Sequence, residues 1–130
     1  MPPTYEPPGP FANLIGLEVA EMGEGSSTAT LDAQERHLNP YGYVHGAVAY
    51  ALVDTSMGGA LSSMAQEGES FATLEIKISY LRPAKMGQLR CETHVLHKSR
   101  RFSMLESQVK QGEDVVATAS GTFAIIPGRE

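Results

Sequence analysis

One segment with a single charged residue, Gly46 to Met64, most constrains how this 130-residue chain can fold. Gly, Ala, Val, Leu and Met fill nearly all of its positions, so a helix formed here is apolar around most of its circumference. Such a helix is normally covered by other parts of the fold. The one carboxylate inside it, Asp54, is costly to bury without compensation. We therefore expect a covered helix in which Asp54 has a function.

The segments around this helix have the signals of β-strands, which alternate apolar and polar residues. The helix is predicted to end near residues 66–68, with Gly68 as its C-terminal stop. A short helical turn is expected at residues 11–17. The strands are predicted as a hairpin at 17–32 and as four runs at about 71–81, 88–98, 102–111 and 115–126. Two strands, one long helix and four strands predict an α+β fold in which an antiparallel sheet covers the helix.

The strand at residues 71–81 alternates most regularly. Its apolar face is predicted to carry Leu74, Ile76, Ile78 and Tyr80, and its polar face Thr73, Glu75, Lys77 and Ser79. Residues 1–10 hold five of the eight prolines, so we expect a flexible lead-in there and a single domain over residues 11–130.

Composition excludes several classes of function. The formal charge of −5 argues against nucleic acid as a partner, because binding phosphates needs a basic face. The sequence contains no leader pattern, and no apolar stretch reaches the roughly 20 residues that span a bilayer. The single cysteine, Cys91, cannot form an intrachain disulfide, and no histidine has a metal-ligand spacing. We expect a cytoplasmic protein with no membrane partner, metal or other cofactor.

The loop before the helix has a distinctive pattern, HLNPYGYVHGA at residues 37–47, with Asp54 following in the helix. It resembles the signature of the hotdog-fold acyl-CoA thioesterases of the phenylacetate-degradation (PaaI-like) subfamily, relatives of 4-hydroxybenzoyl-CoA thioesterase. The resemblance extends over about residues 11–126 and includes ISYLRPAKMG, an SRR turn and ATASGTFAII. One departure is Ala47, which stands where the family usually has a second glycine after the histidine.

The resemblance implies a hotdog fold, in which an antiparallel sheet wraps a long central helix. It also implies hydrolysis of an acyl-CoA to a free acid and coenzyme A, by a dimer or dimer of dimers whose active sites are shared between subunits. Family members act on aryl, aryl-acetyl and medium or long aliphatic acyl groups, and the sequence leaves the acyl class and the tetramer arrangement open. The alternative is a non-catalytic acyl-CoA binding module on the same fold. A hotdog hydratase is a third possibility, but its differently spaced His and carboxylate motif is not matched.

Two candidate catalytic residues lie in the helix segment. The first N–H groups of a helix have no intrahelical acceptor, so Gly46 is a candidate to hold an oxyanion, unless it only relieves a tight turn. Asp54 is a candidate general base or nucleophile, unless its carboxylate caps a neighbouring element. The eight residues between them span about 12 Å of helix, too far to share one carbonyl within a chain. If both serve one site, Asp54 comes from another subunit, which predicts a dimer.

The resemblance adds two catalytic residues: Asn39, which would hold the thioester carbonyl or the attacking water, and Thr73, which would position water. On residue type alone, Asn39 before Pro40 is a turn opener, and Thr73 a packed strand residue. His45 and Ala47 are candidate contacts of the thioester and acyl group, whereas His37 is expected to stabilise the loop. Four basic turn residues are candidate contacts for the coenzyme A phosphates, although solvated charge is the default for such positions: Arg82, Lys85, Arg100 and Arg101.

Overall fold

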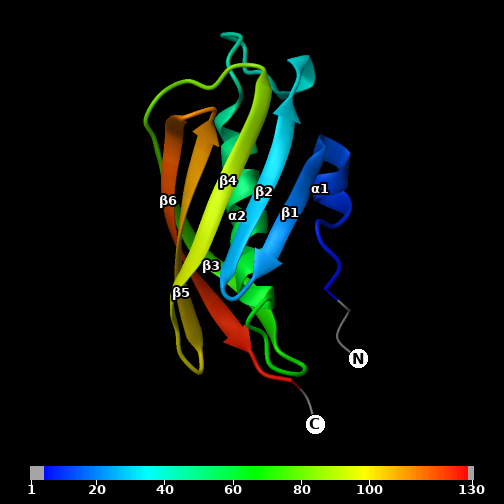
Figure 1. Cartoon of the computed structure of the whole chain (residues 1–130), viewed down its shortest axis with the longest axis vertical. Helices are drawn as coiled ribbons and strands as arrows, with labels where there is room; N and C mark the ends of the chain where they lie inside the picture. The colour runs from blue at the N-terminus through cyan, green and yellow to red at the C-terminus, as the bar shows by residue number, and fades with distance from the viewer. Residues whose placement is uncertain (1–4, 129–130) are drawn as a thin grey trace.

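The computed structural model describes residues 5–128, and it confirms the predicted order of elements (Figure 1). Residues 1–4 of the expected lead-in lie outside the described residues. The elements are α1 (Pro10–Ile15), β1 (Leu17–Gly23), β2 (Ser26–Ala33), the 3-10 turn η1 (Glu35–His37), α2 (Gly46–Ser62), β3 (Ser70–Tyr80), β4 (Gly87–Lys98), β5 (Phe102–Gln111) and β6 (Asp114–Ile126). No helix among the described residues is long and apolar enough to cross a membrane.

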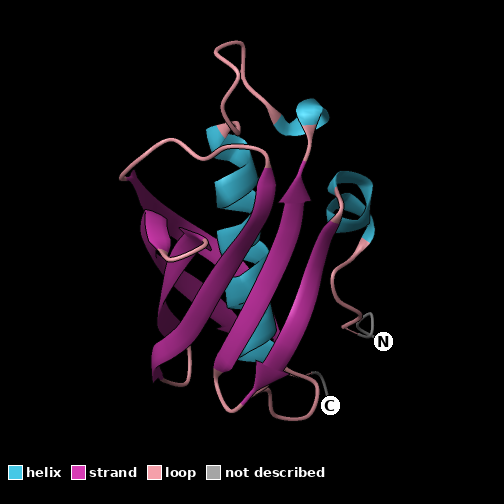
Figure 2. Cartoon of the chain, turned by 45° about the horizontal axis from the view of Figure 1, so that its top comes forward, coloured by secondary structure: helices cyan, strands magenta, loops and turns pink. Residues whose placement is uncertain are grey.

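All six strands form one antiparallel sheet in the order β1-β2-β4-β5-β6-β3, and α2 packs against one face of it (Figure 2). Tight turns join β4 to β5 and β5 to β6, so these strands pair with their neighbours in the chain. The segment leaving α2 instead becomes β3 and pairs only with β6. β3 is therefore an edge strand of 11 residues. This is the predicted α+β architecture.

The core lies between α2 and the sheet. From α2, Leu52, Val53 and Met57 are fully buried, and they face Leu89 and Leu105 of the sheet. The expectation that α2 is covered on all sides is wrong for the single chain. One stripe at helical spacing stays exposed or half-buried, and it consists of Ala47, Tyr50, Ala51, Asp54, Thr55 and Gly58.

The helix ends earlier than the sequence suggests. α2 stops at Ser62, and the cap residue Ser63 donates its hydroxyl to the Ala60 carbonyl at 2.7 Å and accepts the Gly25 N–H at 2.8 Å. Gly68, with a φ of +79°, lies instead in the loop that leads to β3. A serine that satisfies both the last turn and a distant N–H ends this helix before the glycine does.

A β-bulge changes the faces of β3. The register with β6 pairs Thr73 with Phe123 and Glu75 with Thr122, so Leu74 has no partner, and its side chain is 55% exposed. An extra residue reverses the alternation. Thr73 therefore lies on the same face of β3 as Ile76, toward α2. The prediction that Thr73 lies on the other, polar face is wrong.

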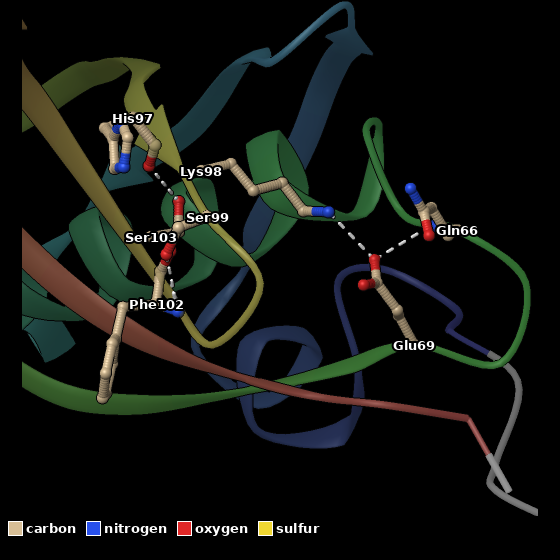
Figure 3. Close-up of polar contacts among 7 residues, drawn as sticks. All are labelled: Gln66, Glu69, His97, Lys98, Ser99, Phe102 and Ser103. Atoms are coloured by element: carbon tan, nitrogen blue, oxygen red, sulfur yellow. Dashed lines mark hydrogen bonds and ion pairs between the residues drawn. The ribbon is translucent and has the colours of Figure 1, made fainter.

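A partly buried ion pair ties the loop after α2 to the end of β4 (Figure 3). Glu69 Oε1 accepts the Gln66 N–H at 3.0 Å and lies 3.0 Å from Lys98 Nζ, and both side chains of the pair are mostly buried. The backbone hydrogen bond and the lysine hold the pKa of Glu69 below its ordinary value. A carboxyl with a lowered pKa stabilises the fold above that ordinary value, and the contribution disappears as the pH falls through the folded pKa.

We predict that Glu69→Gln lowers the free energy of unfolding by about 1 kcal/mol at neutral pH, because a charge-assisted hydrogen bond is lost. The difference from wild type should shrink as the pH falls below the ordinary value of 4.5. Urea unfolding of both proteins between pH 7 and pH 3 measures it. Glu67→Gln, in the same exposed loop, is the matched control, and an equal pH dependence in both variants would contradict the prediction.

Candidate active site

A cavity of about 620 Å³ opens beside the first turn of α2. Asn39 and residues 43–47 line it, together with residues 80–84 from the end of β3 and the following loop, and we call this part the mouth. Its floor is apolar, with Leu89, Val109 and Val116 from the sheet. Polar groups gathered at the mouth of an otherwise apolar cavity are typical of a small-molecule site.

The helix start is capped by a side chain of the loop. His45 is the N-cap residue, and its Nδ1 accepts the Ala47 N–H at 2.9 Å. An Nδ1 that accepts carries no proton, so Nε2 bears the hydrogen of the neutral ring and can donate it to a ligand. The Gly46 N–H is at the first helical position, where no intrahelical acceptor exists. The Gly46 N–H is thus the first backbone donor available to a ligand at the cavity wall, because the Ala47 N–H is already bound to His45.

Asn39 builds the loop at the cavity mouth. Its Oδ1 accepts the Tyr41 N–H at 2.9 Å and the Tyr43 N–H at 3.1 Å, and its backbone N–H donates to the Tyr43 carbonyl at 2.7 Å. The turn-forming role weighed for this residue is therefore real. Because Oδ1 is used in this way, the Nδ2 group is the part of the half-buried side chain that can serve a ligand.

His37 has the structural contacts expected of it. The ring is buried, Nδ1 accepts the Gln34 N–H at 2.9 Å, and Nε2 lies 2.7 Å from the Ile15 carbonyl, to which it donates. Both ring nitrogens are thus satisfied within the chain, and the ring joins η1 to the end of α1.

Asp54, on the exposed stripe of α2, forms a pair with Thr73 of β3, and neither residue lines the cavity. The Thr73 hydroxyl donates to Asp54 Oδ1 at 2.7 Å. Asp54 is half-buried rather than enclosed, which corrects the expected deep burial. The hydrogen bond orients the carboxylate and leaves Oδ2 for another donor, while the Thr73 oxygen can still accept from a water.

The basic candidates divide between the two ends of the molecule (Figure 1). Arg82 lines the cavity and lies 3.2 Å from Asp114 in an exposed ion pair, and the exposed Lys85 follows in the same loop. Arg100 and Arg101 lie in the turn between β4 and β5, at the far end of the 12-residue strand β4. Of the four, only Arg82 lines the cavity of its own chain, and Lys85 lies in the same loop.

Among residues 5–128, no group of three His, Cys, Asp or Glu side chains could hold a metal ion. The Cys91 thiol is buried, and this burial raises its pKa, which disfavours the thiolate needed for nucleophilic attack.

A model of the family described as Thioesterase superfamily matches residues 41–118. The chain belongs to this superfamily. The match includes Gly46, Asp54 and Thr73 and begins two residues after Asn39.

Similar proteins agree with the family. The conserved protein PA5202 of Pseudomonas aeruginosa is 36% identical, with a TM-score of 0.88 over 91% of this chain and 94% of its own. The Escherichia coli PaaI protein of the phenylacetic acid degradation operon is 25% identical, with a TM-score of 0.83 over 91% and 85%. The proofreading thioesterase EntH of Cronobacter turicensis is 30% identical over 75% of this chain and 72% of its own. The fold is thus a hotdog fold, and the enzyme class is that of the thioester hydrolases.

Sequence reasoning missed the role of Tyr80 in this thioesterase site. Tyr80 lines the cavity, and its hydroxyl donates to the Gly46 carbonyl at 2.7 Å. The residue lies within the ISYLRPAKMG stretch that carried the family resemblance, but alternation assigned it only to the apolar face of its strand.

We predict that Thr73→Val lowers kcat of the thioesterase by roughly tenfold, because one hydrogen bond that orients Asp54 is lost. Thr73→Ser keeps the hydroxyl and should stay within about threefold of wild type. Initial rates of thiol release from an acyl-CoA measure both variants. Thr28→Val, in β2, is the matched control, and equal rates for Thr73→Val and wild type would refute an orienting role.

Proposed function

We propose that this thioesterase hydrolyses acyl-CoA to a free acid and coenzyme A in the cytoplasm. The observation that carries the proposal is the first turn of α2 opening into an apolar cavity, with Asn39 and His45 at its mouth. A thioester needs an apolar space for its acyl group and donors for its carbonyl oxygen, and this end of the chain offers both.

The carbonyl oxygen of the thioester is placed at the Gly46 N–H, with the Asn39 Nδ2 group as a second donor. The positive end of the helix dipole favours the negative charge that develops on this oxygen as the carbonyl carbon is attacked. The Nε2–H of His45 is the third donor that we assign to the thioester.

Asp54 supplies the base or the nucleophile. As a general base it takes a proton from water, the resulting hydroxide adds to the carbonyl carbon, and the C–S bond breaks to release the coenzyme A thiolate, which is then protonated. As a nucleophile it forms a mixed anhydride and releases the thiolate first, and water then hydrolyses the anhydride. In both routes Thr73 holds one carboxylate oxygen.

Two subunits are needed to bring these groups together. Within one chain Gly46 and Asp54 are separated by about 12 Å of helix. Two copies of α2, packed antiparallel along their exposed stripes, place Gly46 of one opposite Asp54 of the other when the two-fold axis passes near Tyr50. The small side chains of the stripe, such as Ala47 and Ala51, permit a close approach of two helices.

The contacts of the edge strand β3 favour the same two-fold axis. Thr73 contacts Asp54 and Tyr80 contacts Gly46, so the axis that joins Gly46 to Asp54 also brings Tyr80 of one chain toward Thr73 of the other. The midpoint lies next to Ile76, in the middle of the unpaired edge of β3. Antiparallel pairing of two β3 strands there would extend the sheet across the dimer.

The coenzyme A phosphates are assigned to Arg82 and Lys85 at the cavity, since guanidinium and ammonium groups suit phosphate oxygens. Arg100 and Arg101 can contribute only to the site of another chain. For the acyl group, both an aryl-acetyl and a medium-chain acyl fit an apolar floor, and the likeness to a PaaI protein supports the aryl-acetyl class. The alternative, a non-catalytic acyl-CoA binding module, gives no reason for the Asp54–Thr73 pair.

We predict that wild type releases thiol from members of a panel of aryl-acetyl, aryl and medium-chain acyl-CoAs, and that Asp54→Asn lowers the rate by about 10²–10⁴. The replacement keeps the size of the side chain but removes the base. Circular dichroism of the variant confirms folding. Binding of acyl-CoA by wild type without any hydrolysis would favour the binding module, and a fully active Asp54→Asn would remove Asp54 from the mechanism.

We predict that mixing Asp54→Asn and Asn39→Ala chains, by co-expression or refolding, restores activity that neither variant has alone. A mixed dimer has one site with both defects and one intact site, so random mixing should restore about a quarter of wild-type activity. Asp54→Asn mixed with Asp54→Ala is the control, since no intact site can form. Activity no higher than the sum of the separate variants would mean that each site is built from one chain.

A further inference from the structure

We propose that Tyr80 is a positioning residue of this site, which acts by holding, together with His45, the peptide group between Gly46 and Ala47. The inference rests on the proposed thioesterase function, because it concerns the amide donors of that site. Tyr80 itself is not placed at the reacting atoms.

The two contacts fall on the same peptide group. The C=O of Gly46 and the N–H of Ala47 belong to one planar unit. Tyr80 Oη donates to that C=O at 2.7 Å, and His45 Nδ1 accepts from that N–H at 2.9 Å. One peptide plane is therefore held at both ends by side chains from different elements, β3 and the loop before α2.

We call these two contacts, from Tyr80 and His45, the clamp. The clamp decides which backbone N–H can donate to the thioester carbonyl. A helix start leaves several N–H groups unpaired, and each could compete for the carbonyl oxygen. Here the Ala47 N–H is taken by His45, and the peptide plane that follows Gly46 is fixed by Tyr80. The Gly46 N–H remains as the amide donor at the cavity wall. It belongs to the preceding peptide group, whose His45 carbonyl accepts the Val48 N–H at 2.9 Å, and that group joins the clamped peptide at the Gly46 Cα.

The tyrosine ring also explains why position 46 is a glycine. A Cβ added to Gly46 would lie 3.0 Å from Tyr80 Oη, 3.1 Å from Cζ and 3.3 Å from Cε1. These distances are shorter than ordinary carbon contacts, so with a side chain at position 46 the ring would have to shift by a few tenths of an ångström. Tyr80 therefore contributes to the preference for glycine at this position, beside the approach of a substrate.

The first experiment compares Tyr80→Phe with wild type on an acyl-CoA that wild type hydrolyses. The variant keeps the ring and loses the hydroxyl, so we expect kcat to fall roughly tenfold while KM changes less than about twofold. Tyr41→Phe, at a position that is 87% exposed, is the matched control. A Tyr80→Phe that shifts only the thermal midpoint, or that lowers kcat no more than the control, overturns the proposal.

A double-mutant cycle tests the steric part. Gly46→Ala should lower kcat strongly in wild type, but at least about tenfold less in a Tyr80→Ala background, where the added methyl group has room. Equal losses in both backgrounds would show that the substrate, and not Tyr80, requires the glycine.

Hydrogen exchange separates this inference from the proposed function. In the absence of any substrate, the Ala47 amide should exchange about tenfold faster in Tyr80→Phe than in wild type, because one of the contacts that hold its peptide group is lost. If wild type hydrolyses no thioester but this change is seen, the proposed function fails and the clamp stands. Unchanged exchange at Ala47 overturns the clamp, whatever the activity.

Discussion

The close approach of α2 to the sheet is the constraint on which the rest of the molecule depends. A Cβ added to Gly121 of β6 would lie 2.6 Å from Met57 Sδ, so a larger residue there would force the buried Met57 side chain to move. Small residues alone do not fix the position of a helix along its own axis. Two buried serines fix it here. Ser27 Oγ donates to the Ser56 carbonyl at 2.7 Å and lies 2.8 Å from Ser56 Oγ. Because a buried hydroxyl is costly without its partner, this contact sets the position of α2 along the sheet and hence that of Asp54, two residues away.

Much of the fold could be predicted from the sequence, since strand alternation and turn residues are local signals. The hairpin and the four later strands have nearly the predicted bounds. What could not be predicted depends on contacts between distant segments. Ser63 ends α2 because it meets Gly25 of the turn between β1 and β2. The bulge at Leu74 turns Thr73 toward the helix, and an alternating sequence gives no sign of it.

The candidate site follows the same division. The separation of Gly46 and Asp54 could be predicted from one helix and its length, because helix geometry is regular. The tasks of the loop side chains could not, since they depend on which backbone group each one meets. The Asn39 Oδ1 accepts two N–H groups of the loop, so only its amide hydrogens remain for a ligand. Tyr80 was assigned to an apolar face, but its hydroxyl donates to the Gly46 carbonyl. A residue type limits what a side chain can do, and the fold decides which part of that capacity remains for a ligand.

Ala47 shows how a departure from a family pattern can be compatible with the same chemistry. A glycine at this position would offer a freer backbone, but the backbone here is already helical and its N–H is bound to His45. Alanine is the better helix former, so it favours the capped start that the clamp requires. Its methyl group is exposed at the cavity wall and on the stripe where a second helix would pack. In the proposed dimer, Ala47 would therefore affect the width of the space between the two subunits and the acyl groups that it admits, rather than the Gly46 N–H that is proposed to hold the carbonyl.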